Sequence, residues 1–222
     1  MAQKYLPTGR SKQIASFLEK AQAARGRLVF CLDATASRQP TWDHACQLQS
    51  EMFAEAAKIG GLEIQLVYYR GLEEFRHSGW TTNAHELANQ MSRITCLTGE
   101  TQIARVLAHI RGEHARKPIG AAIFVGDCVE EERGVLYDAA TGLPPLFLFQ
   151  EGADPKAGLV FGELARLTRG AFVRFDSNAA RELAELLRAV ATFAAGGTRA
   201  LIDLRTEGAR RLLTQLNRPV TK

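Results

Sequence analysis

Residues 27–37, Arg-Leu-Val-Phe-Cys-Leu-Asp-Ala-Thr-Ala-Ser, guide the interpretation of the rest of this sequence. Leu28 to Leu32 are consecutive apolar residues, too few for a helix, which is typical of a strand buried on both faces. The run ends at Asp33, and Thr35 and Ser37 follow at alternate positions. Alternate side chains of an extended segment point the same way, so a carboxylate and two hydroxyl groups can converge there. Hard oxygen donors of this kind favour a magnesium-type cation.

The composition is typical of one globular domain. The chain has 222 residues, 46% of them apolar, which suits a single full core with additional helices. We expect neither a membrane span nor a signal peptide, because no apolar run is long enough and the first residues are polar. The scattered cysteines favour reduced thiols in a bacterial-type cytoplasm over a disulfide framework. They are Cys31, Cys46, Cys96 and Cys128.

The positive charge is concentrated in the last part of the chain. Residues 198–222 contain six basic and two acidic side chains, which accounts for the whole net charge of +4. This tail has no aromatic residue, so its charge is weak evidence for nucleic-acid binding. A solvated basic helix face is the simpler interpretation, and we expect no nucleic-acid partner.

Strands and helices alternate along the chain. Apolar runs predict strands at 28–32, 62–69, 119–125, 146–149 and 171–175. Helical periodicity and capping residues predict helices at about 11–24, 41–58, 83–94, 102–114, 130–141, 155–168 and 177–194. The charged segment 74–78 is predicted to be an edge strand. This alternation predicts an α/β fold, a doubly wound, mostly parallel Rossmann-like sheet with helices on both faces.

Three parts are expected along the chain. Residues 1–26 form an N-terminal helix that packs on the domain, 27–195 form the domain, and 196–222 form a basic C-terminal helix after a Gly-Gly hinge. Leucines at helical spacing give that last helix an apolar stripe, which we expect to pack on the domain or on a partner subunit. They are Leu201, Leu204, Leu212, Leu213 and Leu216.

A second predicted strand also ends in an acid, Asp127. In open doubly wound sheets, ligands bind beyond the carboxyl ends of the strands, where the strand order reverses. If strands 28–32 and 119–125 are neighbours, Asp33 and Asp127 face one crevice, and Thr101 can present a hydroxyl to it. The nearby acidic run 130–132 is assigned to the dipole of the helix that it opens rather than to a metal.

The order of these motifs resembles the von Willebrand factor A (VWA) domain with its metal-ion-dependent adhesion site. The motifs are Asp33-x-Thr35-x-Ser37, then Gly99-x-Thr101, then Gly126-Asp127 after an apolar strand. The resemblance covers residues 27–193. It implies that the edge strand near 74–78 is antiparallel.

By this resemblance the site binds Mg²⁺, with Mn²⁺ or Ca²⁺ as alternatives. Thr35 and Ser37 would bind the ion directly, Asp33 and Asp127 directly or through water, and Thr101 would complete or exchange with the shell. One open coordination position would accept a carboxylate of a partner protein. The resemblance therefore implies a cytoplasmic binding module and not an enzyme, working in an assembly with an ATPase or stress-response protein.

Three positions depart from the family pattern or add to it. Thr35 and Ala36 stand where the family most often has serine and glycine, and both restrict the loop backbone. Arg38 follows at the rim of the expected crevice, where it is a candidate to pair with an incoming carboxylate. The alternative for Arg38 is a solvated loop arginine.

Two other interpretations stay open. Thr35 and Ser37 can cap a turn, and Asp127 can cap the helix that follows it, with no metal involved. A magnesium-dependent phosphohydrolase of the haloacid dehalogenase type also begins with an aspartate at a strand end. That chemistry needs a second acid two residues later, where this chain has Thr35.

Overall fold

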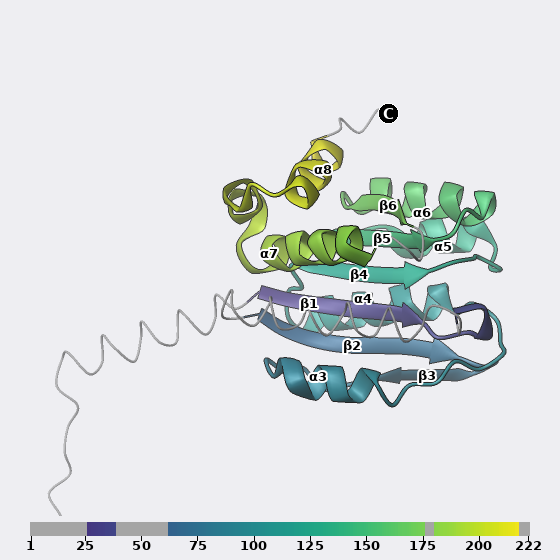
Figure 1. Ribbon diagram of the computed structural model, residues 1–222. Coiled ribbons are helices and arrows are strands. Elements are labelled where there is room, and N and C mark those ends of the chain that lie inside the picture. The colour runs from purple at the N-terminus through teal and green to yellow at the C-terminus, as the bar shows by residue number, and fades with distance from the viewer. Residues whose placement is uncertain (1–25, 39–61, 176–179, 218–222) are drawn as a thin grey trace, which may run out of the picture.

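The computed structural model describes residues 26–38, 62–175 and 180–217. Within these ranges six strands form one sheet in the order β3-β2-β1-β4-β5-β6 (Figure 1). All neighbours are parallel except β2 and β3, which are antiparallel. The strands are β1 (Gly26–Asp33), β2 (Leu62–Arg70), β3 (Glu74–His77), β4 (Ala121–Gly126), β5 (Leu146–Glu151) and β6 (Ala171–Phe175). The predicted α/β fold and its short antiparallel edge strand are confirmed.

Strand β1 lies at the centre of the sheet. It pairs in parallel with β2 on one side and with β4 on the other, so Leu28 is opposite both Ile64 and Ala121. From Arg27 to Asp33 every residue of β1 is buried. The continuous apolar run therefore reflects burial on both faces, because helices cover both sides of a parallel sheet.

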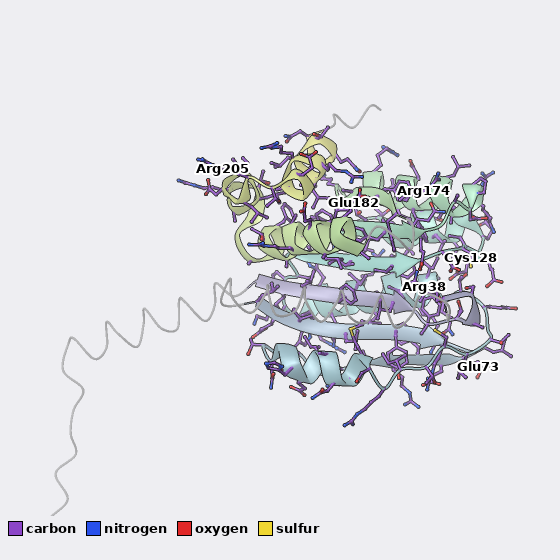
Figure 2. All side chains as sticks on the ribbon, in the orientation of Figure 1. Arg38, Glu73, Cys128, Arg174, Glu182 and Arg205 are labelled. Atoms are coloured by element: carbon purple, nitrogen blue, oxygen red, sulfur yellow. The ribbon has the colours of Figure 1, made fainter. Side chains whose placement is uncertain are left out.

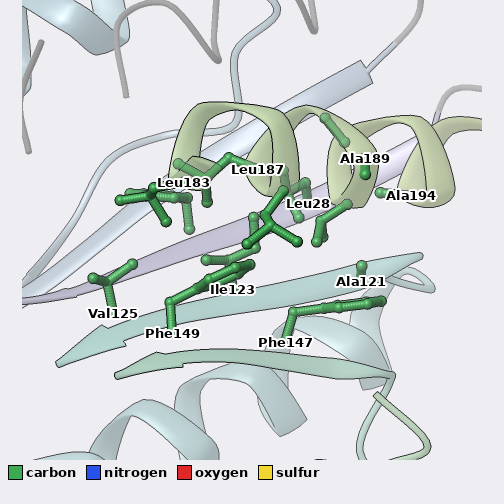
Figure 3. Packing of buried hydrophobic residues seen from close by; sticks show 14 of the residues in the cluster. Leu28, Ala121, Ile123, Val125, Phe147, Phe149, Leu183, Leu187, Ala189 and Ala194 are labelled. Atoms are coloured by element: carbon green, nitrogen blue, oxygen red, sulfur yellow. The ribbon is translucent and has the colours of Figure 1, made fainter. Parts of the chain in front are cut away.

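The described helices divide between the two faces. Those on one face are α3 (Ala84–Met91), α7 (Ala180–Leu204) and α8 (Glu207–Leu216), and those on the other are α4 (Ile103–Arg116), α5 (Arg133–Ala140) and α6 (Pro155–Leu167). Alternate residues of β1 enter the two cores, Leu28 on the α7 side and Val29 on the α4 side. Leu183 and Leu187 of α7 lie in the same core as Leu28, over the sheet (Figure 3).

The C-terminal region differs from the single helix that the sequence predicts. Gly197 has φ 66°, which interrupts α7 at the expected glycine hinge. The helix ends at Leu204, Arg205 has φ 54°, and Thr206 caps α8 by accepting a hydrogen bond from the Ala209 amide. The region is therefore two helical pieces. Leu201 and Leu212 are fully buried in the same core as the sheet, so the leucine stripe packs on the domain.

Some predictions concern residues outside the described ranges. These are the N-terminal helix within 1–26, the helix at 41–58 with Cys46, and the cap of the helix predicted at 177–194. Among the helices that are described, none combines the length and the apolar character needed to cross a membrane.

Candidate functional site

The two acids at strand ends meet where the strand order reverses. The chain runs outward from β1 through β2 to β3, and outward in the other direction from β4 through β5 to β6. A carboxylate oxygen of Asp33, one of Asp127 and the Sγ atom of Cys128 all lie within 4.8 Å of one another. The predicted neighbourhood of β1 and β4 is confirmed, and it brings these two aspartates together.

Asp33 is fully buried and held by two hydrogen bonds. Its Oδ1 accepts from the Thr35 amide at 2.8 Å, and its Oδ2 accepts from the Tyr69 hydroxyl at 2.8 Å. Burial raises the pKa of the Asp33 carboxyl and the nearby Asp127 adds to this, whereas the hydrogen bonds from Thr35 and Tyr69 oppose it. The carboxylate thus has a fixed orientation at the end of β1.

The two hydroxyl groups predicted for the site lie together. Thr35 Oγ1 and Ser37 Oγ are 3.1 Å apart and share a hydrogen bond, with Thr35 buried and Ser37 exposed. Ser37 lies in the short helix η1 (Ala36–Arg38). Thr35 forms a bridge with Leu97, whose amide donates to the Ala34 carbonyl at 3.1 Å. This contact ties the loop after β1 to the segment that leads into α4.

Asp127 is half-buried and has spare hydrogen-bonding capacity. Its Oδ1 atom is inaccessible to solvent and has no hydrogen-bond partner among the described residues. It does not cap α5, because Glu132 fills that role by accepting from the Val135 amide at 3.0 Å. Neighbouring Cys128 is a poor magnesium ligand, since burial, with the charges of Asp127 and Asp33, raises the pKa of its thiol to about 12.

Thr101 makes its hydrogen bonds with two acids rather than leaving its hydroxyl free for a metal. Its hydroxyl donates to the Glu131 carboxylate and accepts from the Glu130 amide at 3.0 Å, while its own amide donates to the Glu130 carboxylate at 2.7 Å. Glu131 also accepts from the Ala104 amide at 3.1 Å. Glu131 thus caps α4, whose own N-cap residue Gln102 makes no side-chain cap. Assigning all of 130–132 to the next helix was wrong, since only Glu132 serves it.

The predicted position of Arg38 at the solvent rim was also wrong. Arg38 is 1% exposed, and its side chain forms an ion pair with Glu151 at the end of β5. Burial lowers the pKa of Arg38, and the charges of Asp33 and Asp127 oppose this shift. A buried arginine needs such acidic neighbours, so Arg38 is part of the charge balance of the site. Figure 2 labels Arg38 and Cys128 at the same end of the sheet.

The donors fit a hard divalent cation in part. Asp33, Thr35, Ser37 and Asp127 provide carboxylate and hydroxyl oxygens, and the unpartnered Asp127 Oδ1 has capacity for an ion. Thr101 fits only after its hydroxyl leaves Glu131.

Sequence reasoning missed three residues of this site: Tyr69, Glu131 and Glu151. Tyr69 had a usable signal, because it lies near the end of the strand beside β1 and opposite Asp33 in the ladder. The contacts of Glu131 and Glu151 join segments that are distant in sequence.

Comparisons with known proteins support the fold. No protein-family model matches the chain, and no curated protein is significantly similar in sequence. A von Willebrand factor type A structure from Catenulispora acidiphila is 18% identical with a TM-score of 0.64, and the match covers 78% of this chain and 43% of that one. This chain thus spans less than half of that protein.

Two further solved structures have a similar fold. An aerotolerance-related membrane protein from Bacteroides fragilis is 14% identical with a TM-score of 0.55, over 71% of this chain and 96% of that one. The SpRpn10 VWA domain is 8% identical with a TM-score of 0.58, over 71% of this chain and 94% of that one. At such identities the likeness shows the fold alone, and this chain has the fold of a von Willebrand factor A domain.

Proposed function

We propose that this chain is a protein-interaction module in which Mg²⁺, held between the ends of β1 and β4, binds an acidic residue of a partner protein. The observation that carries the proposal is the buried Asp127 Oδ1 atom, without a hydrogen-bond partner among the described residues and part of a group that includes Asp33. Two carboxylates this close repel each other unless a proton or a cation lies nearby. A hard cation suits both of them.

The proposed ligands are Asp33, Asp127, Thr35 and Ser37. Bound magnesium would supply a positive centre with an exchangeable coordination position, which a carboxylate of the partner can occupy. Thr101 joins the shell only if its hydroxyl exchanges Glu131 for the ion. Mn²⁺ and Ca²⁺ are alternatives with the same oxygen chemistry.

The buried Arg38 guanidinium affects the strength of this site. Its positive charge acts on Asp33 and Asp127 and lowers the cost of keeping both acids together when no ion is bound. The positive charge of Arg38 also repels the metal ion and so weakens its binding. We therefore expect a site that loads reversibly and not a permanent structural metal.

Binding is favoured over catalysis. The rival interpretation as a phosphohydrolase requires Asp33 to act as a nucleophile, yet both of its oxygens accept hydrogen bonds from the protein. The proposed setting is a bacterial cytoplasmic assembly, with an ATPase or stress-response protein as the partner class that the VWA resemblance implies. The free thiols of Cys31, Cys96 and Cys128 are compatible with a reducing compartment.

The test compares thermal unfolding of the full chain in Mg²⁺ and in EDTA. A ligand at 100-fold excess over its Kd stabilises a protein by about 2.7 kcal/mol, which is a rise in Tm of roughly 5–10 °C for a chain of this size. Asp127→Asn should abolish the rise. This variant is preferred to a change at Asp33, which holds Thr35 and Tyr69 in the fold.

The matched control is Glu100→Gln, an exposed acid in the segment before α4. It should keep the magnesium-dependent rise in Tm. Equal Tm values for the wild type in Mg²⁺ and in EDTA, at concentrations up to 20 mM or so, would contradict the proposal.

A further inference from the structure

We propose that the same end of the sheet carries a second contact surface, which docks a basic segment of a partner protein with an apolar side chain at its centre. The surface is centred on Leu72 and Leu97, together called the leucine rim. This inference goes beyond the metal-binding proposal and does not require a metal.

The leucine rim consists of two exposed apolar side chains on adjoining loops. Leu72 is 74% exposed in the turn between β2 and β3, and Leu97 is 44% exposed before α4. The Gly71 amide nitrogen lies 3.5 Å from the Leu97 carbonyl oxygen. A Cβ atom at Gly99 would overlap the Gly71 carbonyl oxygen, so only glycine permits this approach of the two backbones. The two loops therefore form one continuous surface.

Helix α4 holds the turn of Leu72 in place. Gln102 donates from Nε2 to the Gly71 carbonyl at 3.4 Å, and Arg105 donates from Nη1 to the Glu73 carbonyl at 2.9 Å. The packing leaves Leu72 uncovered although its backbone is anchored. An apolar side chain on an anchored backbone loses little conformational freedom when a partner binds, which favours docking.

The charge around the leucine rim defines the partner. The loops and strand ends at this end, residues 33–38, 70–74, 95–102, 126–133 and 151–155, contain ten acidic and three basic side chains. Arg105 and Lys156 also reach this end, where they donate to the Glu73 and Glu130 carbonyls, so the net charge is −5 in a chain of net charge +4. Exposed Glu73 and Glu100 lie in the same two loops as the leucines. Figure 2 labels Glu73 and Cys128 at this end and Arg205 at the opposite end. A basic segment is attracted to such a surface, and an acidic one is repelled.

The leucine rim adjoins the candidate metal site through the bridge between Thr35 and Leu97. A partner carboxylate that reached the metal would have to enter a field of negative charge. Basic residues beside that carboxylate, placed against Glu73 and Glu100, would offset this repulsion. The apolar side chain of the partner would then lie on Leu72 and Leu97.

The test is a selection from a phage-displayed library of random 12-residue peptides, carried out in EDTA so that its result does not depend on a metal. Wild-type protein is the target, and the double variant Leu72→Ser, Leu97→Ser is the counter-target. Peptides that bind only the wild type should have a net positive charge and an apolar residue between the basic ones. Synthesised, they should bind the double variant at least about tenfold more weakly.

Two controls distinguish binding at the leucine rim from nonspecific binding of the peptides. Ile202→Ser removes an exposed apolar residue, 56% accessible, from α7 and should leave peptide affinity unchanged. The double variant Glu73→Gln, Glu100→Gln should weaken binding mainly at low salt. The serine variants should unfold at the wild-type Tm, because both leucines are exposed.

Three results would overturn the proposal. The first is a selection in which no peptide distinguishes the wild type from the leucine double variant. The second is enrichment of acidic peptides. The third is self-association of the wild type, seen by sedimentation, that the leucine double variant abolishes, since this would assign the surface to a second copy of the chain. Failure of the magnesium test would leave these results unaffected.

Discussion

The hydrogen bond between Tyr69 and Asp33 shows how single residues maintain the site. Asp33 is fully buried, and a buried carboxylate without partners is strongly destabilising. The Tyr69 hydroxyl comes from the neighbouring strand at the same level of the sheet and donates at 2.8 Å. The Tyr69 ring also stacks on Phe124, with the ring centroids 6.3 Å apart. The ring therefore packs in the core while its hydroxyl solvates the acid.

Tyr69→Phe should lower the free energy of unfolding by about 1–3 kcal/mol, because the ring stays packed while a buried carboxylate loses a hydrogen bond. Urea denaturation at neutral pH measures the difference. Tyr68→Phe, on the half-buried neighbouring residue, is the control and should change stability by less than about 0.5 kcal/mol. Equal losses for the two variants would show that the Asp33 contact contributes nothing specific.

At the scale of elements, α8 protects the edge of the sheet at β6. The Gln215 side chain accepts from the Phe172 amide at 2.8 Å and donates to the Phe172 carbonyl at 2.8 Å. A side-chain amide thus makes the pair of hydrogen bonds that a further strand would make. An open strand edge is a template for unwanted pairing, and this contact closes part of it.

Gln215→Ala should reduce the hydrogen-exchange protection of the Phe172 amide by about tenfold and lower stability by about 1–2 kcal/mol, since two hydrogen bonds to the strand edge are lost. Exchange measured by NMR gives the first value and urea denaturation the second. Thr214→Ala, at the exposed neighbouring position, is the matched control. Unchanged protection of Phe172 in Gln215→Ala would contradict this role.

At the scale of the whole molecule, the C-terminal region and the sheet share one core. Leu201, Ala209 and Leu212 are buried in the same cluster as residues of β1 and β4. Arg211 also forms an ion pair with Glu182 near the start of α7. The expected boundary at residue 196 thus coincides with the interruption of α7 at Gly197, and the packing predicts that both sides unfold together.

Leu212→Ala should destabilise the entire chain by about 2–5 kcal/mol, because it leaves a cavity in the shared core. Thermal unfolding should remain one transition at a lower Tm by circular dichroism and by intrinsic fluorescence. Leu213→Ala, at a half-buried position, should cost less. A separate early transition confined to α8 would instead indicate an independent C-terminal unit.

Sequence patterns predicted most of the fold because the signals are local. An apolar run on its own indicates a strand buried on both faces, and alternation with amphipathic helices indicates a parallel sheet. The sheet order was decided by the structure, because doubly wound sheets occur with more than one strand order. The break between Leu204 and Glu207 was missed because the leucine stripe keeps helical spacing across it. Arg205 also adopts a left-handed conformation, which is uncommon for arginine and is not predictable from its residue type.

The candidate site was predictable only in part. Asp33 and Asp127 each end a strand, so their meeting follows from strand order alone. The contacts of Arg38 and Thr101 were not predicted because their partners, Glu151 at the end of β5 and Glu131 in a loop, belong to segments that only the folded chain brings near. A charged or polar side chain in a loop carries no sequence mark that distinguishes burial from exposure.

The sequence by itself indicated the α/β architecture, the burial of β1 on both faces, and the positions of Asp33 and Asp127 at two strand ends, with Thr35 and Ser37 in the loop after the first of them. Each of these depends on the period and length of apolar runs, which the chain carries locally. Tertiary structure alone decided the charge balance of the site and its surroundings. The buried Arg38–Glu151 pair, the cap of Glu131 on α4 and the adjoining loops of Leu72 and Leu97 depend on contacts between distant segments. Such contacts are set by packing geometry, and no local pattern encodes them.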